Sequence, residues 1–148
     1  MSVLRMTQIV LDAIRAHGEE TYPHECCGAL IGESTGEGWR VKEAMRAGNT
    51  RTDSAHNRYS IAPLELVRME REARRLGLEI AGFYHSHPDH PAQWSKTDFE
   101  EAHWLGCFYV ITEVGQGKAA VTNAFLLTGP SEEDKQFVQG SIQLEEQP

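Results

Sequence analysis

Two apolar runs of strand length constrain the fold of this chain most strongly. They are residues 26–32 and 78–84; both contain glycine, as buried β-strands often do. Residues 7–17 and 63–76 repeat apolar side chains every three or four positions, which predicts amphipathic helices that stop at the glycines that follow. Strands that alternate with helices in a chain of this length predict a sheet with helices packed against it.

The rest of the chain is predicted to add smaller elements to this frame. They are a turn at 36–38, a strand at 39–45, a loop at 49–57 with an extended segment at 58–62, a loop at 89–94, a helix from Ser95 to about Leu105, strands at 107–114 and 119–127, and an edge strand or short helix at 137–144. The two strands before the last element are separated only by a glycine-containing turn, which predicts a hairpin. We therefore predict one α/β (α+β) domain over residues 1–148, with a mixed or mainly antiparallel sheet.

Charge and hydropathy exclude several classes of protein. The 148 residues carry 14 Lys and Arg against 22 Asp and Glu, a net charge of −8, which argues against nucleic-acid binding. No apolar run approaches the roughly 18 residues of a membrane span, and the first residues are too polar for a secretory signal, so the expected location is cytoplasmic. Basic side chains outnumber acidic ones between residues 40 and 75, which fits either a solvated helix face or a partner with an acidic surface.

The three cysteines do not indicate a disulfide framework or a thiolate zinc site. Cys26 and Cys27 are adjacent, Cys107 stands alone, and no CxxC spacing occurs. We expect all three to be small buried residues of strands. A thiol of the adjacent pair as an extra metal ligand is disfavoured, because neighbours on a strand point to opposite faces.

The chemically informative stretch lies where the second apolar run ends, at His85-Ser86-His87-Pro88. Side chains two positions apart on a strand point to the same side, so both imidazoles can reach one metal ion. A carboxylate on the following helix, Asp98, can complete a set of two histidines and one acid, which leaves the fourth position of a catalytic zinc site to water. The alternative is structural: Ser95 and Asp98 fit an S-x-x-D capping box, and the histidines fit a polar corner at a strand end.

Other residues near this stretch have two interpretations each. Glu25 directly precedes the first apolar run and is the candidate general base, with an exposed loop acid as the alternative. Trp94 precedes Ser95 and either lines a groove for an extended peptide or packs onto the new helix. His90 is expected to be solvated, with an adventitious ligand as the alternative.

The complete pattern resembles the JAMM (MPN+) metallopeptidase family. It consists of Glu25 before a C-G-x-L-x-G strand, then H-S-H-P, six residues, Ser95, two residues and Asp98. The resemblance covers roughly residues 7–128. It implies an α/β sandwich around a mixed, curved sheet, related in architecture to cytidine deaminases. It also implies that His85, His87 and Asp98 hold Zn²⁺, that Glu25 is the general acid/base, and that Ser95 stabilises the oxyanion.

The activity implied by the resemblance is zinc-dependent hydrolysis of the amide bond after the C-terminal tail of a small protein. That protein would be a β-grasp ubiquitin-like or sulfur-carrier protein ending in Gly-Gly, because the chain is too short for the insertions of eukaryotic deubiquitinating members and resembles a compact prokaryotic one. The alternatives are an isopeptidase acting on ubiquitin-like conjugates, a member that needs a partner for activity, and a non-catalytic MPN scaffold. The complete motif argues against the scaffold.

Overall fold

The computed structural model describes residues 1–49 and 60–146. The elements of this part in chain order are β1 (Val3–Thr7), α1 (Gln8–Thr21), β2 (Cys27–Thr35), β3 (Gly38–Ala47), α2 (Pro63–Arg75), β4 (Glu79–Pro88), α3 (Lys96–Glu100), β5 (Phe108–Gly115), β6 (Lys118–Thr128), β7 (Gln136–Gln139) and β8 (Ser141–Glu145). The predicted loop at 49–57 and extended segment at 58–62 lie mostly outside the described residues, and residues 60–62 form no strand. None of the described helices is long and apolar enough to span a membrane.

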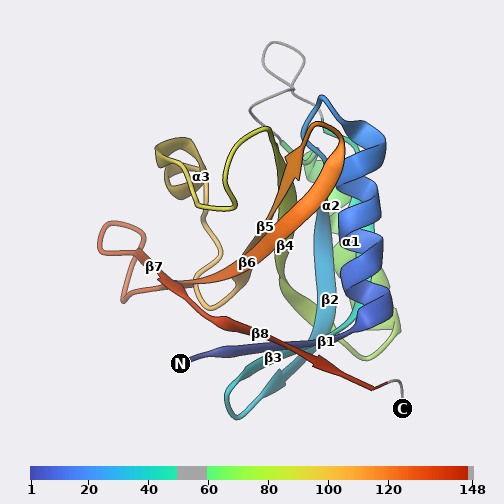
Figure 1. The fold of residues 1–148 in the computed structure, drawn as a ribbon. Helices are drawn as coiled ribbons and strands as arrows, with labels where there is room; N and C mark the ends of the chain where they lie inside the picture. Colours follow the sequence, from blue (N-terminus) through green and yellow to red (C-terminus); the bar gives the residue numbers. More distant parts are fainter. Residues whose placement is uncertain (50–59, 147–148) are drawn as a thin grey trace.

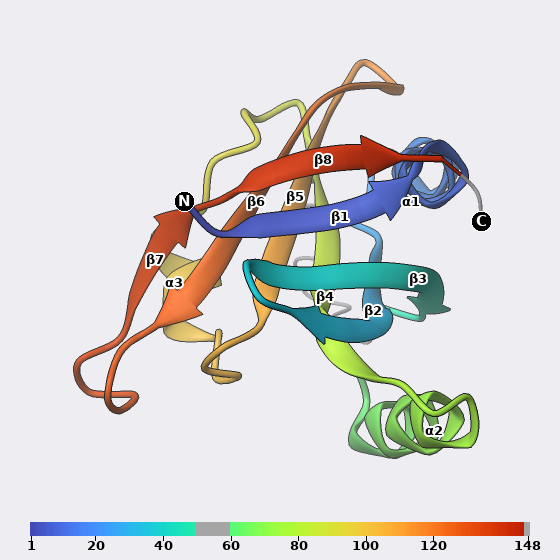
Figure 2. The ribbon, with the colours of Figure 1, turned by 90° about the horizontal axis from the view of Figure 1, so that it is seen from below.

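The described strands form one mixed sheet in the order β7-β6-β5-β4-β2-β3-β1-β8 (Figure 1). The central strand β4 is antiparallel to β2 and parallel to β5, and β5 and β6 form the predicted hairpin. Helix α1 packs on one face of the sheet, whereas α2 and α3 contribute to the core on the other face; Figure 2 shows α1 and α2 on opposite sides of β2 and β3. The predicted fold class, a mixed curved sheet flanked by helices, is confirmed.

The sheet is so strongly curved that its two edge strands are connected in sequence by a single residue. Strands β7 and β8 occupy opposite edges, yet only Gly140 separates them in sequence. The Gly140 amide donates to the Ala124 carbonyl at 2.9 Å, and a Cβ there would lie 2.7 Å from a ring carbon of Phe108. Figure 2 shows β8 beside β1 and β7 beside β6. The segment 137–144, predicted as one edge strand or short helix, is therefore two edge strands.

The N-terminal elements differ from the sequence prediction in two respects. Strand β1 was not predicted; it is five residues long and pairs in parallel with β3 and β8, which are distant in sequence. Helix α1 does not stop at Gly18 but continues to Thr21. A Cβ on Gly18 would lie 3.0 Å from Val114 Cγ2 and 3.2 Å from Ser86 Cβ. This glycine therefore serves the close approach of helix and sheet and does not end the helix.

Helix α3 is shorter than predicted, because it ends at Glu100 and not near Leu105. The Lys135 ammonium donates to the Ala102 carbonyl at 2.7 Å, so a side chain takes the place of a further helical turn. The next residues pack separately, with the Trp104 ring edge-on to Phe83 at 5.2 Å. The residues after Glu100 thus contact distant parts of the chain and form no further helical turn.

The core has one layer on each face of the sheet. On β4, Tyr84 belongs to the layer on the α1 side, whereas Phe83 belongs to the layer on the α2 side. The strand alternation continues beyond them, so His85 and His87 share the face of Phe83. The end of β4 therefore presents both histidines to the side of the sheet where α2 and α3 lie.

His17 makes the stability of this fold depend on pH. Its Nδ1 lies 2.8 Å from the Tyr84 hydroxyl, and the side chain is buried. Burial foremost, then the charge of Arg46, lowers the pKa of His17 from 6.5 to about 4, against a smaller opposing effect of Glu20. Between these two pKa values the unfolded chain binds more protons at His17 than the folded protein does. The contribution of His17 to the free energy of unfolding is therefore complete above pH 6.5 and is lost as the pH falls towards 4.

We expect His17→Asn to lose part of the pH dependence of unfolding. Between pH 7.5 and 4.5, the free energy of unfolding of the wild type should fall by about 2 to 3 kcal/mol more than that of the variant. Urea unfolding with a chelator present, at several pH values, measures this difference. A gap between the two proteins that stays constant across this range would contradict the prediction.

Candidate metal centre

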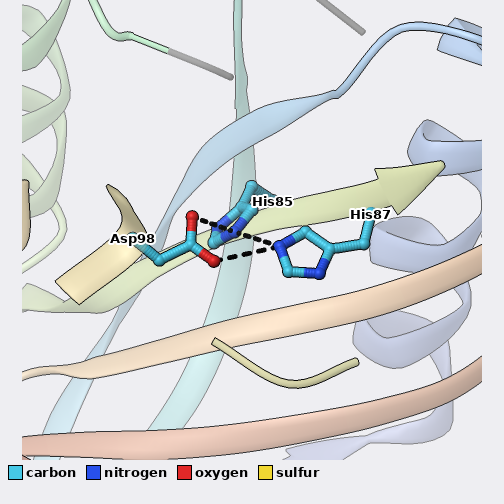
Figure 3. A group of neighbouring side chains, drawn as sticks. All are labelled: His85, His87 and Asp98. Atoms are coloured by element: carbon cyan, nitrogen blue, oxygen red, sulfur yellow. Dashed lines mark hydrogen bonds and ion pairs between the residues drawn. The ribbon is translucent and has the colours of Figure 1, made fainter. Parts of the chain in front are cut away.

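Strand β4 places two histidines on one buried face. His85 pairs with Cys27 of β2 and Ile111 of β5 in the sheet registers, and the exposed fractions of His85 and His87 are 2% and 8%. Both rings point towards the carboxylate of Asp98, which comes from α3 (Figure 3). The structure thus brings together the two predicted histidines and the predicted acid.

The first turn of α3 fixes the carboxylate of Asp98. The Ser95 hydroxyl accepts from the Asp98 amide at 3.0 Å, and Asp98 Oδ2 accepts from the Ser95 amide at 2.9 Å, which is the predicted capping box. The same carboxylate lies 3.2 Å from His85 Nε2 through Oδ1 and 3.0 Å from His87 Nε2 through Oδ2. The capping and ligand interpretations therefore do not compete, because the cap orients the acid towards the histidines.

The spacing of these atoms fits a small tetrahedral cation. The two Nε2 atoms are 3.2 Å apart, and the candidate ligand atoms all lie within 4.8 Å of one another. Zinc bonds of about 2.0–2.1 Å at a tetrahedral angle would separate neighbouring ligand atoms by about 3.3–3.4 Å. The arrangement is therefore close to that of three ligands around one ion.

A hydrogen bond from Nδ1 of His87, the outer ring nitrogen that points away from Asp98, fixes which tautomer the neutral ring adopts. His87 Nδ1 lies 2.8 Å from the Pro91 carbonyl, which can only accept, so Nδ1 carries the proton. A neutral His87 then directs the lone pair of Nε2 at a carboxylate oxygen, which is also an acceptor. A cation is needed between them, either a second proton on the ring or a metal ion. A backbone carbonyl on the outer nitrogen is also typical of metal-bound histidines.

The charges of the three groups agree with this need for a cation. Burial alone would raise the pKa of Asp98, but the two histidines and the Ser95 amide hold it far below its ordinary value. Burial opposes protonation of His87, yet the Asp98 carboxylate and the Pro91 carbonyl outweigh it and raise the pKa of His87. For His85 the burial dominates and lowers the pKa. The site thus holds a fixed negative charge beside a neutral imidazole.

Glu25 lies two residues before β2, on the side of the histidines. Cys27 is paired with His85 in the antiparallel register, so two residues earlier the chain brings Glu25 opposite His87. The side chain is 4% exposed, and Oε1 has no hydrogen-bond partner among the described residues. Burial foremost, with Asp98 and Glu101 against an opposing effect of His87, raises the pKa of Glu25 to about 8. Glu25 is not the exposed loop acid of the alternative interpretation.

Trp94 packs onto the helix that it precedes. Its ring lies 5.4 Å from that of Phe99 and 5.5 Å from that of Phe137, as in a hydrophobic staple, although 41% of the side chain stays exposed.

His90 is exposed and is not part of the group of candidate ligands. Cys26 and Cys27 are buried in opposite core layers, as strand alternation predicts.

Three residues that the sequence did not single out support the site. Pro91 offers its carbonyl to His87, the buried Ser86 hydroxyl accepts from the Cys26 amide at 2.9 Å, and the Asn49 side chain donates to the Glu25 carbonyl at 3.3 Å. The last two bonds hold the backbone on either side of the Glu25 side chain. For Ser86 the sequence held one signal, its place between the two histidines, whereas Pro91 and Asn49 act through contacts that no local pattern marks.

Comparisons with known proteins agree with this geometry. A family model described as prokaryotic homologs of the JAB domain matches residues 7–128. A desampylase of Haloferax volcanii is 34% identical over 104 residues, which cover 68% of this chain and 73% of that protein. The probable TtuB-protein conjugate cleaving protease of Thermus thermophilus is 31% identical over 102 residues, which cover 69% of this chain and 65% of that protein.

Solved structures show the same fold. The solution structure of a Desulfitobacterium hafniense protein has a TM-score of 0.82 at 25% identity, and that of a Salinibacter ruber protein has a TM-score of 0.70 at 36% identity. Each comparison covers 97% of this chain and 94% of the other.

Proposed function

Because this chain belongs to the JAMM (MPN+) metallopeptidase family, among the prokaryotic homologs of the JAB domain, we propose that it cleaves the amide bond after the C-terminal tail of a small ubiquitin-like or sulfur-carrier protein. It is a hydrolase, as are its two named relatives. The single observation that carries the proposal is the convergence of His85, His87 and Asp98, with the buried carboxyl of Glu25 on the same side.

The resident cofactor in this proposal is Zn²⁺, held by His85, His87 and Asp98. Two nitrogens and one carboxylate suit zinc, and three protein ligands leave one position open for a reactant. The outer nitrogen of His87 already has the backbone partner that such ligands use. Bound zinc would supply a Lewis acid for the scissile carbonyl and lower the pKa of water.

The residues of the chain would move the protons. Glu25 would accept the proton of the attacking water and pass it to the leaving amine, since its Oε1 is committed to no hydrogen bond within the described residues. The Ser95 oxygen accepts from the Asp98 amide, so its own proton can be donated to the oxyanion of the tetrahedral intermediate. Burial raises the pKa of Glu25, and a cation bound by the three neighbouring ligands would lower it again and favour the carboxylate form that acts as a base.

A hollow of about 380 Å³ lies on the face of β4 that carries the histidines and is lined by Phe83, Trp104 and Tyr109 among others. We propose that part of the extended substrate binds in this hollow. The cytoplasm, whose thiols stay reduced, suits the buried free cysteines.

The names of the relatives favour an isopeptide bond over a linear one. One relative is named a conjugate cleaving protease and the other a desampylase. We therefore expect the zinc-loaded protein to cleave a β-grasp carrier ending in Gly-Gly faster from a lysine side chain than from an α-amine, by about tenfold in kcat/KM. Two substrates that share the carrier and the acceptor peptide, and differ only in the amine used, measure this ratio.

A metal chelator should stop both reactions, and added zinc should restore them. Equal rates on the two substrates would contradict the preference for the isopeptide bond, but the proposal that the protein hydrolyses amide bonds would stand. No cleavage of either substrate by protein that holds zinc would overturn the proposed function.

A further inference from the structure

Residues beyond the segment matched by the family model reach back to the helix that carries Asp98. The match ends at residue 128, and the chain then turns at Gly129, with φ +132°, to enter β7. A Cβ on Gly129 would lie 2.6 Å from the Asp134 carbonyl, so the loop that follows folds closely onto its own start. This brings Lys135 and Phe137 to α3.

Helix α3 has little to stabilise it by itself. It is five residues long and contains no buried residue, and a helix this short is not stable alone. Its capping box satisfies amides at its start, but the last carbonyls of a helix need other donors. The position of Asp98 therefore depends on contacts that come from outside the helix.

Lys135 donates to backbone carbonyls at the end of α3 and just beyond it. Its Nζ lies 2.7 Å from the Ala102 carbonyl and 3.4 Å from the Glu100 carbonyl, and it stands 5.0 Å over the centre of the Phe99 ring. A cation at the negative end of a helix is also favoured by the helix dipole. Glu132 of the same loop lies 3.2 Å from His103 just beyond the helix, which gives a second, exposed link.

Phe137 holds the other side of the same helix. Its ring lies 5.5 Å from that of Trp94 before α3, 5.6 Å from that of Phe99 within it, and 5.6 Å from that of Tyr109 on β5. This aromatic contact joins both ends of the first helical turn to the sheet. Asp98 lies between Trp94 and Phe99 in sequence, so its main chain is fixed from both sides.

We propose that Lys135 and Phe137, here called the clamp, are positioning residues that hold Asp98 at the metal centre and thereby set its affinity for zinc. The clamp rests on the proposed metal site but concerns residues that neither bind metal nor touch the reacting atoms. It gives a role to the part of the chain that follows the matched segment.

The test is the zinc affinity of Lys135→Met, measured by competition with a chromophoric chelator. Removal of a positive charge near a cation site should by charge alone strengthen zinc binding. We expect the opposite: Lys135→Met should have a dissociation constant for zinc about tenfold higher than the wild type. This is the lower end of the range seen when a residue that orients a metal ligand is removed. Lys135→Arg should recover most of the affinity, because it keeps a cation over the Phe99 ring and donors at the carbonyls.

Lys96→Met is the matched control. Lys96 is exposed, lies on α3 only two residues from Asp98, and loses the same charge in the same substitution. It should bind zinc as tightly as the wild type, or more tightly. Weakening of the same size in Lys96→Met, or an affinity of Lys135→Met within twofold of the wild type, would overturn the clamp.

Hydrogen exchange in the metal-free protein provides a second readout. Exchange at the amides of residues 99–102 should be about tenfold faster in Lys135→Met and in Phe137→Leu than in the wild type, while near-UV circular dichroism shows an intact core. Unchanged exchange in both variants would also overturn the clamp. If the wild type binds no zinc, the proposed function fails, but this comparison still decides whether the clamp holds α3.

Discussion

Replacement of Glu25 by glutamine is expected to lower kcat by about a thousandfold, within the range of roughly 10² to 10⁴ that positioned acid and base groups contribute. Glutamine fills the same buried space but cannot accept the proton of water. His85, His87 and Asp98 remain, so the variant should still bind zinc stoichiometrically. Turnover of a carrier conjugate, measured beside metal content in the same preparation, separates the loss of the base from the loss of the metal.

Glu33→Gln is the control for this substitution. Glu33 lies on the same strand β2 but is exposed, far along the strand from the histidines, near Arg40 and Lys42. Its turnover should equal that of the wild type. Full turnover in Glu25→Gln would show that Glu25 is not the base, whereas loss of zinc together with activity would show that it supports the metal site.

The site could be anticipated from sequence because its signals are local. His85 and His87 share a face through the two-residue period of a strand, and Ser95 and Asp98 are related by the three-residue spacing of a capping box. The buried strand after Glu25 has an apolar run that marks it. Each signal needs only a few neighbouring residues, so the start of α3 was placed correctly and the start of β2 to within one residue, whereas β4 continues past the apolar run to Pro88.

The features that were missed depend on contacts between distant parts of the chain. Strand β1 has no strong pattern of its own and forms because β3 and β8 pair with it. Gly18 resembles a helix stop, but it is needed because a Cβ at this position would crowd Val114 where α1 packs closely on the sheet. Lys135, more than thirty residues later, donates to the Ala102 carbonyl just beyond α3, and periodicity contains no information about such a partner.

Replacement of Asp98 by asparagine is expected to weaken zinc binding by more than about 100-fold, beyond the loss caused by an outer partner. Asparagine keeps an oxygen that can accept from the Ser95 amide, so the capping box and α3 should persist. The substitution removes the negative charge that both histidines face. It therefore separates the two roles of this side chain, the cap and the ligand.

Asp89→Asn is the matched control for the loss of a carboxylate near the histidines. Asp89 lies two residues after His87, but its carboxylate accepts from the Tyr22 hydroxyl at 2.6 Å and from the Gln116 amide at 2.8 Å, away from the ligand group. This variant should bind zinc as the wild type does. If Asp98→Asn also kept zinc at wild-type affinity, the acid would be a cap alone, and the metal site would lack its third protein ligand. Only Asp98 faces the histidines. Equal loss of zinc in both variants would therefore show that the overall negative charge at this end of the sheet holds the metal, and that Asp98 is not a specific ligand.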